Sequence, residues 1–185
     1  MKVIGLVGPI GSGKDTVSDY ISKKYAYKVI VMGDIVREIA TELGRGHMRD
    51  DLQLTQREIV AKYGMEYFAK RVVEKIRTNK WENVIINGIR RPEDAAVPKR
   101  EFGKDMVVAL VDALPQIRFE RLKARKRQGD PNTMEEFHRQ EENEKKLFHW
   151  EETKKFVDDI IINNDGRFEH LYKNVDAFMK KFGLA

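Results

Sequence analysis

A glycine-rich run near the N-terminus holds the residues of this sequence with the clearest chemistry. Gly8-Pro9-Ile10-Gly11-Ser12-Gly13-Lys14 matches the pattern G-x-x-x-x-G-K, and Asp15 and Thr16 follow it directly. Glycines in such a run let backbone N–H groups turn toward phosphate oxygens, and the lysine adds a positive charge. The spacing therefore predicts that residues 8–16 bind the phosphates of a nucleoside triphosphate, with Lys14 reaching the β- and γ-phosphates.

Asp15 departs from the usual form of this pattern, in which a serine or threonine follows the lysine and binds Mg²⁺. A carboxylate is also a good ligand for Mg²⁺, and Thr16 supplies a hydroxyl one residue later. We therefore expect Asp15 and Thr16 at the metal ion. Asp15 could instead only stabilise the first turn of the following helix through the helix dipole, and the sequence leaves both interpretations open.

Charged residues follow two of the later apolar runs. Asp34 and Arg37 come after the second run, and Arg90 and Arg91 after the third. A carboxylate can orient or deprotonate an acceptor, and a guanidinium group suits a phosphate. Because ligands gather at the ends of such strands, we predict that these four residues belong to a binding site. The ordinary alternatives are that Asp34 caps a helix and that the arginines are solvated surface charges.

The segment 118–146 is highly charged and contains Gly129-Asp130-Pro131. It predicts two exposed helices joined by a hinge, which would close as a lid over the triphosphate. Arg121 and Arg125 would then offset negative charge on the transferred group. A solvated helix with paired charges would have the same composition. Six basic residues crowd into ten positions: Arg118, Arg121, Lys123, Arg125, Lys126 and Arg127.

Short apolar runs and amphipathic segments alternate along the chain. Runs without strict polar alternation are typical of parallel strands that are covered on both faces. Such runs lie at 2–7, 29–32, 84–86, 106–111 and 160–162, and helical spacing of apolar residues occurs at 35–43 and 65–77. We predict an α/β fold: a doubly wound, five-stranded parallel sheet with helices on both faces and a helical lid. Ligands of such sheets bind at the carboxyl ends of the strands.

Composition restricts the class of protein. The 185 residues fit one domain, 1–185, and 35 basic against 30 acidic residues give a net charge of +5, which suits phosphate ligands. There is no continuous basic tract, so we do not expect nucleic acid as a partner. Cysteine is absent and the four histidines are scattered, which argues against structural zinc. The apolar runs are too short to span a membrane and no basic leader is apparent, so we expect a cytoplasmic protein. Its oligomeric state is left open.

Together these motifs resemble the P-loop small-molecule kinases, most closely the dephospho-CoA kinase and nucleoside monophosphate (adenylate) kinase group in an archaeal-type form. Gly8–Thr16 with Met32–Arg37 is similar to the start of these kinases, and Ile85–Pro92 to their third strand, where an arginine holds the acceptor's phosphate. The resemblance also implies that Asp34 orients or deprotonates the acceptor in catalysis and that Arg37, Arg90 and Arg91 bind the acceptor. Asn87 stands where that group commonly has an acid. Asp159–Gly166 resembles their last strand and the loop beside adenine, which implies that Asn164 contacts the nucleotide.

The resemblance implies ATP as co-substrate with Mg²⁺, and transfer of the γ-phosphoryl group to a small phosphorylated metabolite or nucleotide. Residues of about 44–80 carry no motif, and we assign them to the acceptor side as a helical segment. The alternative function is a nucleotide-responsive ATPase or binding protein that controls docking to RNA or protein. A GTPase switch fits less well because no N-K-x-D motif is present, although the choice between ATP and GTP is open.

Overall fold

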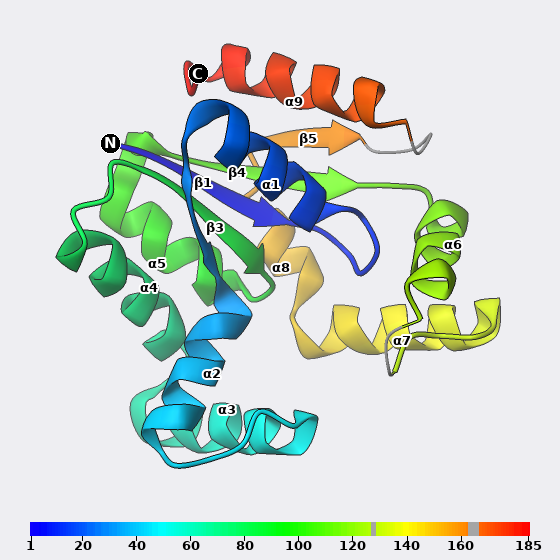
Figure 1. Cartoon of the computed structure of the whole chain (residues 1–185). Helices are drawn as coiled ribbons and strands as arrows, with labels where there is room; N and C mark the ends of the chain where they lie inside the picture. Colours follow the sequence, from blue (N-terminus) through cyan, green and yellow to red (C-terminus); the bar gives the residue numbers. More distant parts are fainter. Residues whose placement is uncertain (127–128, 163–166) are drawn as a thin grey trace.

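The computed structural model of the chain describes residues 1–126, 129–162 and 167–185 (Figure 1). At its centre lies a sheet of five parallel strands in the order β2-β3-β1-β4-β5. The predicted five-stranded parallel sheet is therefore confirmed, and β3 is longer than expected. The strands are β1 (Lys2–Val7), β2 (Lys28–Val31), β3 (Asn83–Ile89), β4 (Met106–Asp112) and β5 (Asp159–Ile162).

The central strand β1 explains why the apolar runs do not alternate with polar residues. It pairs with β3 on one side and β4 on the other. Val3 and Val7 are buried in one apolar cluster, and Ile4 and Leu6 in a second. Both faces of the sheet are thus covered, and every position of the strand favours an apolar side chain.

Helices cover both faces, as a doubly wound sheet requires (Figure 1). On the face of Ile4 and Leu6 lie α1 (Lys14–Tyr25) and α9 (Phe168–Lys181), and on the opposite face lie α4 (Tyr67–Thr78) and α5 (Pro92–Phe102). The short α8 (Trp150–Lys154) contacts α5, and the 3₁₀ helix η1 (Gly103–Asp105) follows α5. Within the described ranges, no helix has the length and apolar character needed to cross a membrane.

Two helices extend away from the sheet. The chain leaves β2 directly into α2 (Met32–Glu42), and α3 (Arg49–Tyr63) packs against α2 at the end of the molecule farthest from α9 (Figure 1). The segment that we assigned to the acceptor, about 44–80, therefore contains two different helices. Its second helix, α4, buries Phe68, Val72 and Ile76 in the core, so only α3 stands apart from the sheet.

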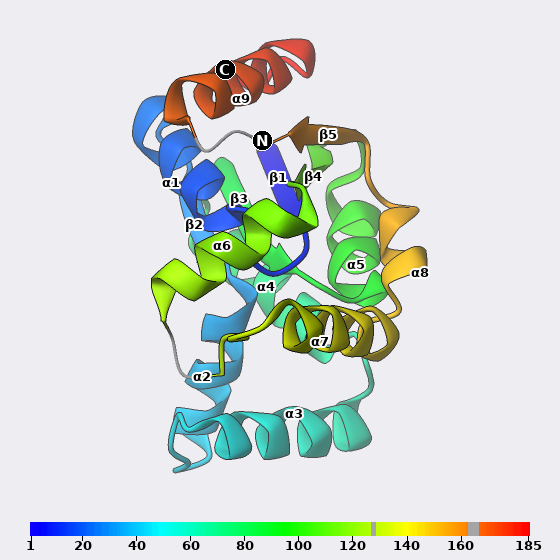
Figure 2. The same cartoon turned by 90° about the vertical axis from the view of Figure 1, so that its right-hand side faces the viewer.

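The predicted lid region also forms two helices, α6 (Pro115–Arg125) and α7 (Met134–Leu147). Figure 2 shows α6 crossing in front of the strand ends, with α7 beneath it. The two helices share a small apolar cluster of Phe119, Leu122 and Phe137, against which Ile10 of the glycine-rich loop packs. The segment is thus less exposed than expected, because it rests on the loop that it was predicted to cover.

Candidate active site

The glycine-rich loop joins β1 to α1, and close packing explains two of its glycines. A side chain at Gly8 would place a Cβ 2.3 Å from the backbone oxygen of Val111, and one at Gly11 would lie 2.8 Å from the backbone oxygen of Arg118. Gly11 also has a φ of 78°, which is unfavourable for other residues. The loop is therefore clamped between β4 and α6, and its backbone groups have a fixed direction.

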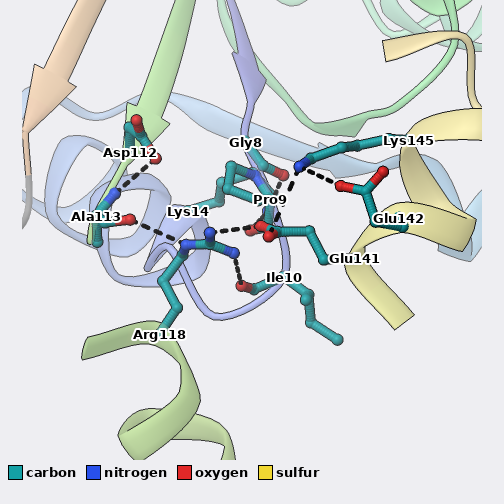
Figure 3. Close-up of polar contacts among 10 residues, drawn as sticks. All are labelled: Gly8, Pro9, Ile10, Lys14, Asp112, Ala113, Arg118, Glu141, Glu142 and Lys145. Atoms are coloured by element: carbon teal, nitrogen blue, oxygen red, sulfur yellow. Dashed lines mark hydrogen bonds and ion pairs between the residues drawn. The ribbon is translucent and has the colours of Figure 1, made fainter. Parts of the chain in front are cut away.

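Lys14 is the first residue of α1, and its side chain folds back onto the loop (Figure 3). Its Nζ donates to the backbone oxygen of Gly8 at 2.7 Å and of Pro9 at 3.0 Å. Burial lowers the pKa of Lys14 to about 8, and the positive charge of Arg90 adds to this effect. Asp15 has a smaller, opposing influence on the same pKa. The phosphates of a triphosphate bound at the loop would place negative charge beside this ammonium and so favour its charged form.

The two predicted metal ligands lie side by side at the start of α1. Asp15 is exposed and accepts a hydrogen bond of 2.9 Å from Nδ2 of Asn87 on β3, whereas Thr16 is half-buried. In the part of the chain that the structure describes, no group of three acidic, histidine or cysteine side chains could hold a metal ion. A Mg²⁺ ion would fit here with most of its ligands from phosphate oxygens and water, as is usual for this ion.

Arg121 and Arg125 of α6 both lie beside the loop. Nη1 of Arg121 donates to the backbone oxygens of Gly11 at 3.4 Å and Ser12 at 3.3 Å. Arg125 pairs with Asp130, whose hydrogen bond raises the pKa of Arg125, and the charge of Asp15 contributes in the same direction. The structure therefore brings Arg121 to the phosphate loop, and closure of the two arginines over a triphosphate stays a prediction.

Arg118, which we expected among the exposed lid cations, is buried. Its side chain and that of Glu141 on α7 form an ion pair with Arg118 3% and Glu141 9% exposed (Figure 3). Nε of Arg118 also donates to the backbone oxygen of Ala113 at 2.9 Å, and its guanidinium group lies 5.1 Å from the centre of the Phe137 ring. Arg118 thus fastens α7 and the loop to α6, and it is not free to follow a ligand.

Asp34 and Arg37 lie on α2, just beyond the carboxyl end of β2. They form an ion pair with each other, and their side chains are 56% and 48% exposed. Because β2 and β3 are parallel neighbours, the start of α2 and the residues after β3 lie at the same edge of the sheet. Asp34 is therefore within α2 and does not cap it from outside, since the helix begins at Met32.

Arg90 and Arg91 follow β3 and are held by a buried carboxylate. Their backbone N–H groups donate to Oδ2 of Asp94 at 3.2 and 3.0 Å. Both guanidinium groups face the ring of Phe148 at the end of α7, at 5.2 Å for Arg90 and 5.9 Å for Arg91. Nη1 of Arg91 also contacts Sδ of Met65 at 3.6 Å. Ile89 pairs with Val7 of β1, so the loop that begins at Arg90 lies beside the start of the phosphate loop at Gly8.

Some functional candidates gave no signal in the sequence. Phe148 lies 58 positions after Arg90 in the numbering and is brought to it only by the fold. A groove of about 400 Å³ between α1 and α9 is lined by Thr16, Phe168 and Tyr172, among others, and the rings of Tyr20 and Tyr172 stack 3.9 Å apart in it. Asn164, the predicted nucleotide contact, lies outside the described residues.

Most of the residues of the candidate site lie in a segment that matches a known protein family. Residues 7–138 match the family described as an AAA domain, from the end of β1 into α7. The chain belongs to this family. The matched part contains the P-loop, the arginines after β3 and most of the lid, so the family assignment includes the whole candidate phosphate site.

Sequence relatives place the chain in the UPF0200 family as well. It is 33% identical over 183 residues to the UPF0200/UPF0201 protein of Archaeoglobus fulgidus, and this match covers 98% of the chain but only 56% of that relative. It is 38% identical over 135 residues to the UPF0200 protein of Hyperthermus butylicus, which covers 73% of the chain and 71% of the relative. The chain thus spans little more than half the length of one relative and most of the other.

Solved structures show the fold. TT1252 from Thermus thermophilus superimposes with a TM-score of 0.65 at 20% identity, covering 97% of each chain. A shikimate kinase from Bacteroides thetaiotaomicron gives a TM-score of 0.60 at 16% identity, covering 99% of each chain. These likenesses confirm the predicted P-loop kinase-like α/β fold. The resemblance to dephospho-CoA and nucleoside monophosphate kinases remains a prediction.

Proposed function

We propose that this protein is an ATP-dependent phosphotransferase that moves the γ-phosphoryl group of Mg²⁺-bound ATP to a small phosphorylated metabolite or nucleotide. The observation that supports this most is that two sets of cations converge on one loop. Arg121 of the lid donates to the backbone of the P-loop, and Arg90 directly follows Ile89, which pairs with Val7 just before the loop. A phosphoryl group in transit between donor and acceptor would lie between such groups, where positive charge stabilises the transition state.

On the donor side, the backbone of residues 8–16 would hold the triphosphate at the N-terminus of α1. Lys14, Arg121 and Arg125 would offset the negative charge that develops during transfer. Asp15 and Thr16 would face a Mg²⁺ ion, which would supply positive charge beside the phosphates. The groove lined by Thr16 and Phe168 would suit the nucleoside, because Thr16 belongs to the phosphate loop and Phe168 is 58% exposed. Asn164 would contact the base, as the kinase resemblance implies.

On the acceptor side, Arg37, Arg90 and Arg91 would bind an anionic group. Guanidinium groups can hold a phosphate through two parallel hydrogen bonds. Asp34 would orient the attacking group, and α3 would form the outer wall of the acceptor site. Dephospho-CoA presents a hydroxyl, which benefits from a base, whereas a nucleoside monophosphate presents an ionised phosphate that is already nucleophilic.

An ADP-release assay over a panel of acceptors tests this function. The panel holds dephospho-CoA, ribonucleoside and deoxyribonucleoside monophosphates, phosphomevalonate and shikimate, each with Mg²⁺ and ATP. We expect one class to stimulate ADP release and to yield a phosphorylated product by mass spectrometry. ATP binding without any product, together with ATP-dependent capture of RNA or protein, would instead support the nucleotide-responsive binding protein.

Asp34→Asn separates the two kinds of acceptor chemistry. If the acceptor is a hydroxyl, removal of the base should lower kcat by about 100-fold or more. If the acceptor is a phosphate, the loss should be much smaller. Equal losses on a hydroxyl and a phosphate acceptor would exclude Asp34 as a base. The matched control is Glu38→Gln, one turn further along α2, where the side chain pairs with Lys75.

A further inference from the structure

Asp15 and Asn87 meet where α1 passes the end of β3. Asn87 pairs in the sheet with Leu6 of β1 and Val31 of β2, and it is only 3% exposed. The pairing of β3 with β1 is irregular immediately after Asn87, at Gly88, and such bulges redirect neighbouring side chains. Nδ2 of Asn87 donates to Oδ1 of Asp15 at 2.9 Å. A buried amide therefore holds an exposed carboxylate in place beside the P-loop.

The orientation of this amide follows from its partner. If the amide were reversed, its oxygen would face a carboxylate oxygen and the two acceptors would repel each other. With Nδ2 facing Asp15, Oδ1 of Asn87 is buried and has no hydrogen-bond partner among the described residues. A buried acceptor without a partner is destabilising, and a water molecule bound to a metal ion would supply the missing donor.

The carboxylate itself is free to face a ligand. Within residues 1–126, 129–162 and 167–185, no ion pair involves Asp15, although its charge affects both Lys14 and Arg125. In the usual P-loop, the residue after the lysine is a serine or threonine and an acid on a neighbouring strand completes the metal site. Here the loop carries the acid and the strand carries the neutral side chain, so the total charge of the pair is unchanged.

We propose that Asp15 and Asn87 form the Mg²⁺ subsite of this P-loop, with the acid and the neutral residue exchanged between loop and strand. Asp15 is the carboxylate that faces the ion, and Asn87 positions this carboxylate. The inference rests on the proposed function, since it needs a nucleoside triphosphate at the loop. Other ligands of the ion would be phosphate oxygens and water, which is consistent with the absence of an acidic cluster in the described residues.

The competing explanation is a purely structural hydrogen bond between α1 and β3. Asp15→Asn separates the two, because the amide oxygen of an asparagine can still accept from Asn87 while the charge is lost. A structural bond would survive this change and a metal subsite would not. The exchanged pair is then tested by Asp15→Ser combined with Asn87→Asp, which moves the acid back to the strand.

The experiment measures metal binding without turnover. Each variant is saturated with an ATP analogue whose β,γ-bridge is an imido group, and Mn²⁺ is titrated with detection of free ion by electron paramagnetic resonance. We expect Asp15→Asn to weaken Mn²⁺ binding by about 10- to 100-fold with an unchanged Tm, as loss of a ligand or of its supporting partner commonly does. The double variant should recover most of this affinity relative to Asp15→Ser alone. Asp105→Asn, just before β4 at the opposite end of the sheet from the P-loop, is the control and should bind Mn²⁺ like the parent protein.

Two results would overturn the exchanged subsite while leaving the proposed function intact. These are parental Mn²⁺ affinity in Asp15→Asn, or no recovery in the double variant compared with Asp15→Ser. If the parent protein itself does not bind the analogue, with or without Mn²⁺, the proposed function fails and the subsite fails with it.

Discussion

The donor and acceptor sides of the candidate site are built in different ways. The P-loop is held by the backbone: β4 and α6 leave no space for side chains at Gly8 and Gly11, and the buried Arg118 ties the lid to it. On the acceptor side, Asp34 and Arg37 are about half exposed and pair only with each other among the described contacts. The donor side is therefore preformed, whereas the acceptor side is left free to adapt to its ligand.

This contrast has a measurable consequence. Substitutions that loosen the donor side should affect stability as well as activity, because the phosphate loop is part of the packed interior. Substitutions on the acceptor side should affect activity alone. The following predictions test this difference, beginning with the largest expected effect.

Arg118→Met should lower the free energy of unfolding by about 3–5 kcal/mol, because it removes the close partner of the buried Glu141 and leaves it only Lys145 at 3.7 Å among the described ion pairs. Urea denaturation measures the loss. The double variant Arg118→Met/Glu141→Leu should recover much of it, since a packed apolar pair can replace a buried ion pair. Lys70→Met, which breaks an exposed pair with Glu66, is the control and should cost less than about 1 kcal/mol. A single variant as stable as the parent would contradict the preformed donor side.

Lys14→Ala should lower kcat by about 100-fold or more, as loss of a donor that stabilises the transition state commonly does. Steady-state ADP release with the acceptor found in the panel measures this. Lys104→Ala, at an exposed lysine just before β4 at the opposite end of the sheet, should leave kcat unchanged. Normal turnover in Lys14→Ala would remove this lysine from the reaction.

Arg37→Gln should raise KM for the acceptor by about 10-fold or more, because it removes a charge-assisted hydrogen bond worth about 1.5–3 kcal/mol. The KM for ATP and the Tm should not change, which is the feature that distinguishes the acceptor side. Arg77→Gln, in an exposed pair with Glu101 on the outside of the molecule, is the control. A loss of stability in Arg37→Gln would contradict the contrast between the two sides.

The smallest effect is a proton taken up on nucleotide binding. Since burial lowers the pKa of Lys14 to about 8, about half of this ammonium is deprotonated in the free protein near that pH. Phosphates raise its pKa again, so binding near pH 8 should take up roughly half a proton per site and weaken as the pH rises further. Calorimetry in two buffers of different ionisation enthalpy measures the uptake. Lys14→Arg, which stays charged, should show none, and absence of uptake in the parent protein would contradict the lowered pKa.

Features that depend on local sequence were predicted well. The glycine spacing located the P-loop, and unbroken apolar runs located the strands, because both patterns reflect constraints on neighbouring residues. Helix boundaries were less accurate: α2 begins at Met32 and not at Ile35, since the chain turns into the helix directly after β2. No helix was predicted for α5, which contains Pro98 within its span.

Features that depend on contacts between distant segments could not be predicted. The sequence around Arg118 is that of an exposed cationic helix, and only the approach of Glu141, 23 positions later, buries it. Likewise, Asp15 and Asn87 are 72 positions apart, and they meet because β3 lies beside β1 in the sheet. The roles of Asp34, Arg37, Arg90 and Arg91 remain predictions, because their position at one edge of the sheet does not identify the acceptor.

Titration calorimetry of the protein with ATP in the presence of Mg²⁺ tests the central claim most directly. We predict saturable binding at one site per chain, weaker when EDTA removes the metal and much weaker in Lys14→Ala. No uptake of any nucleoside triphosphate with Mg²⁺ present, under conditions in which the protein is folded, would contradict the account of the P-loop as a nucleotide site.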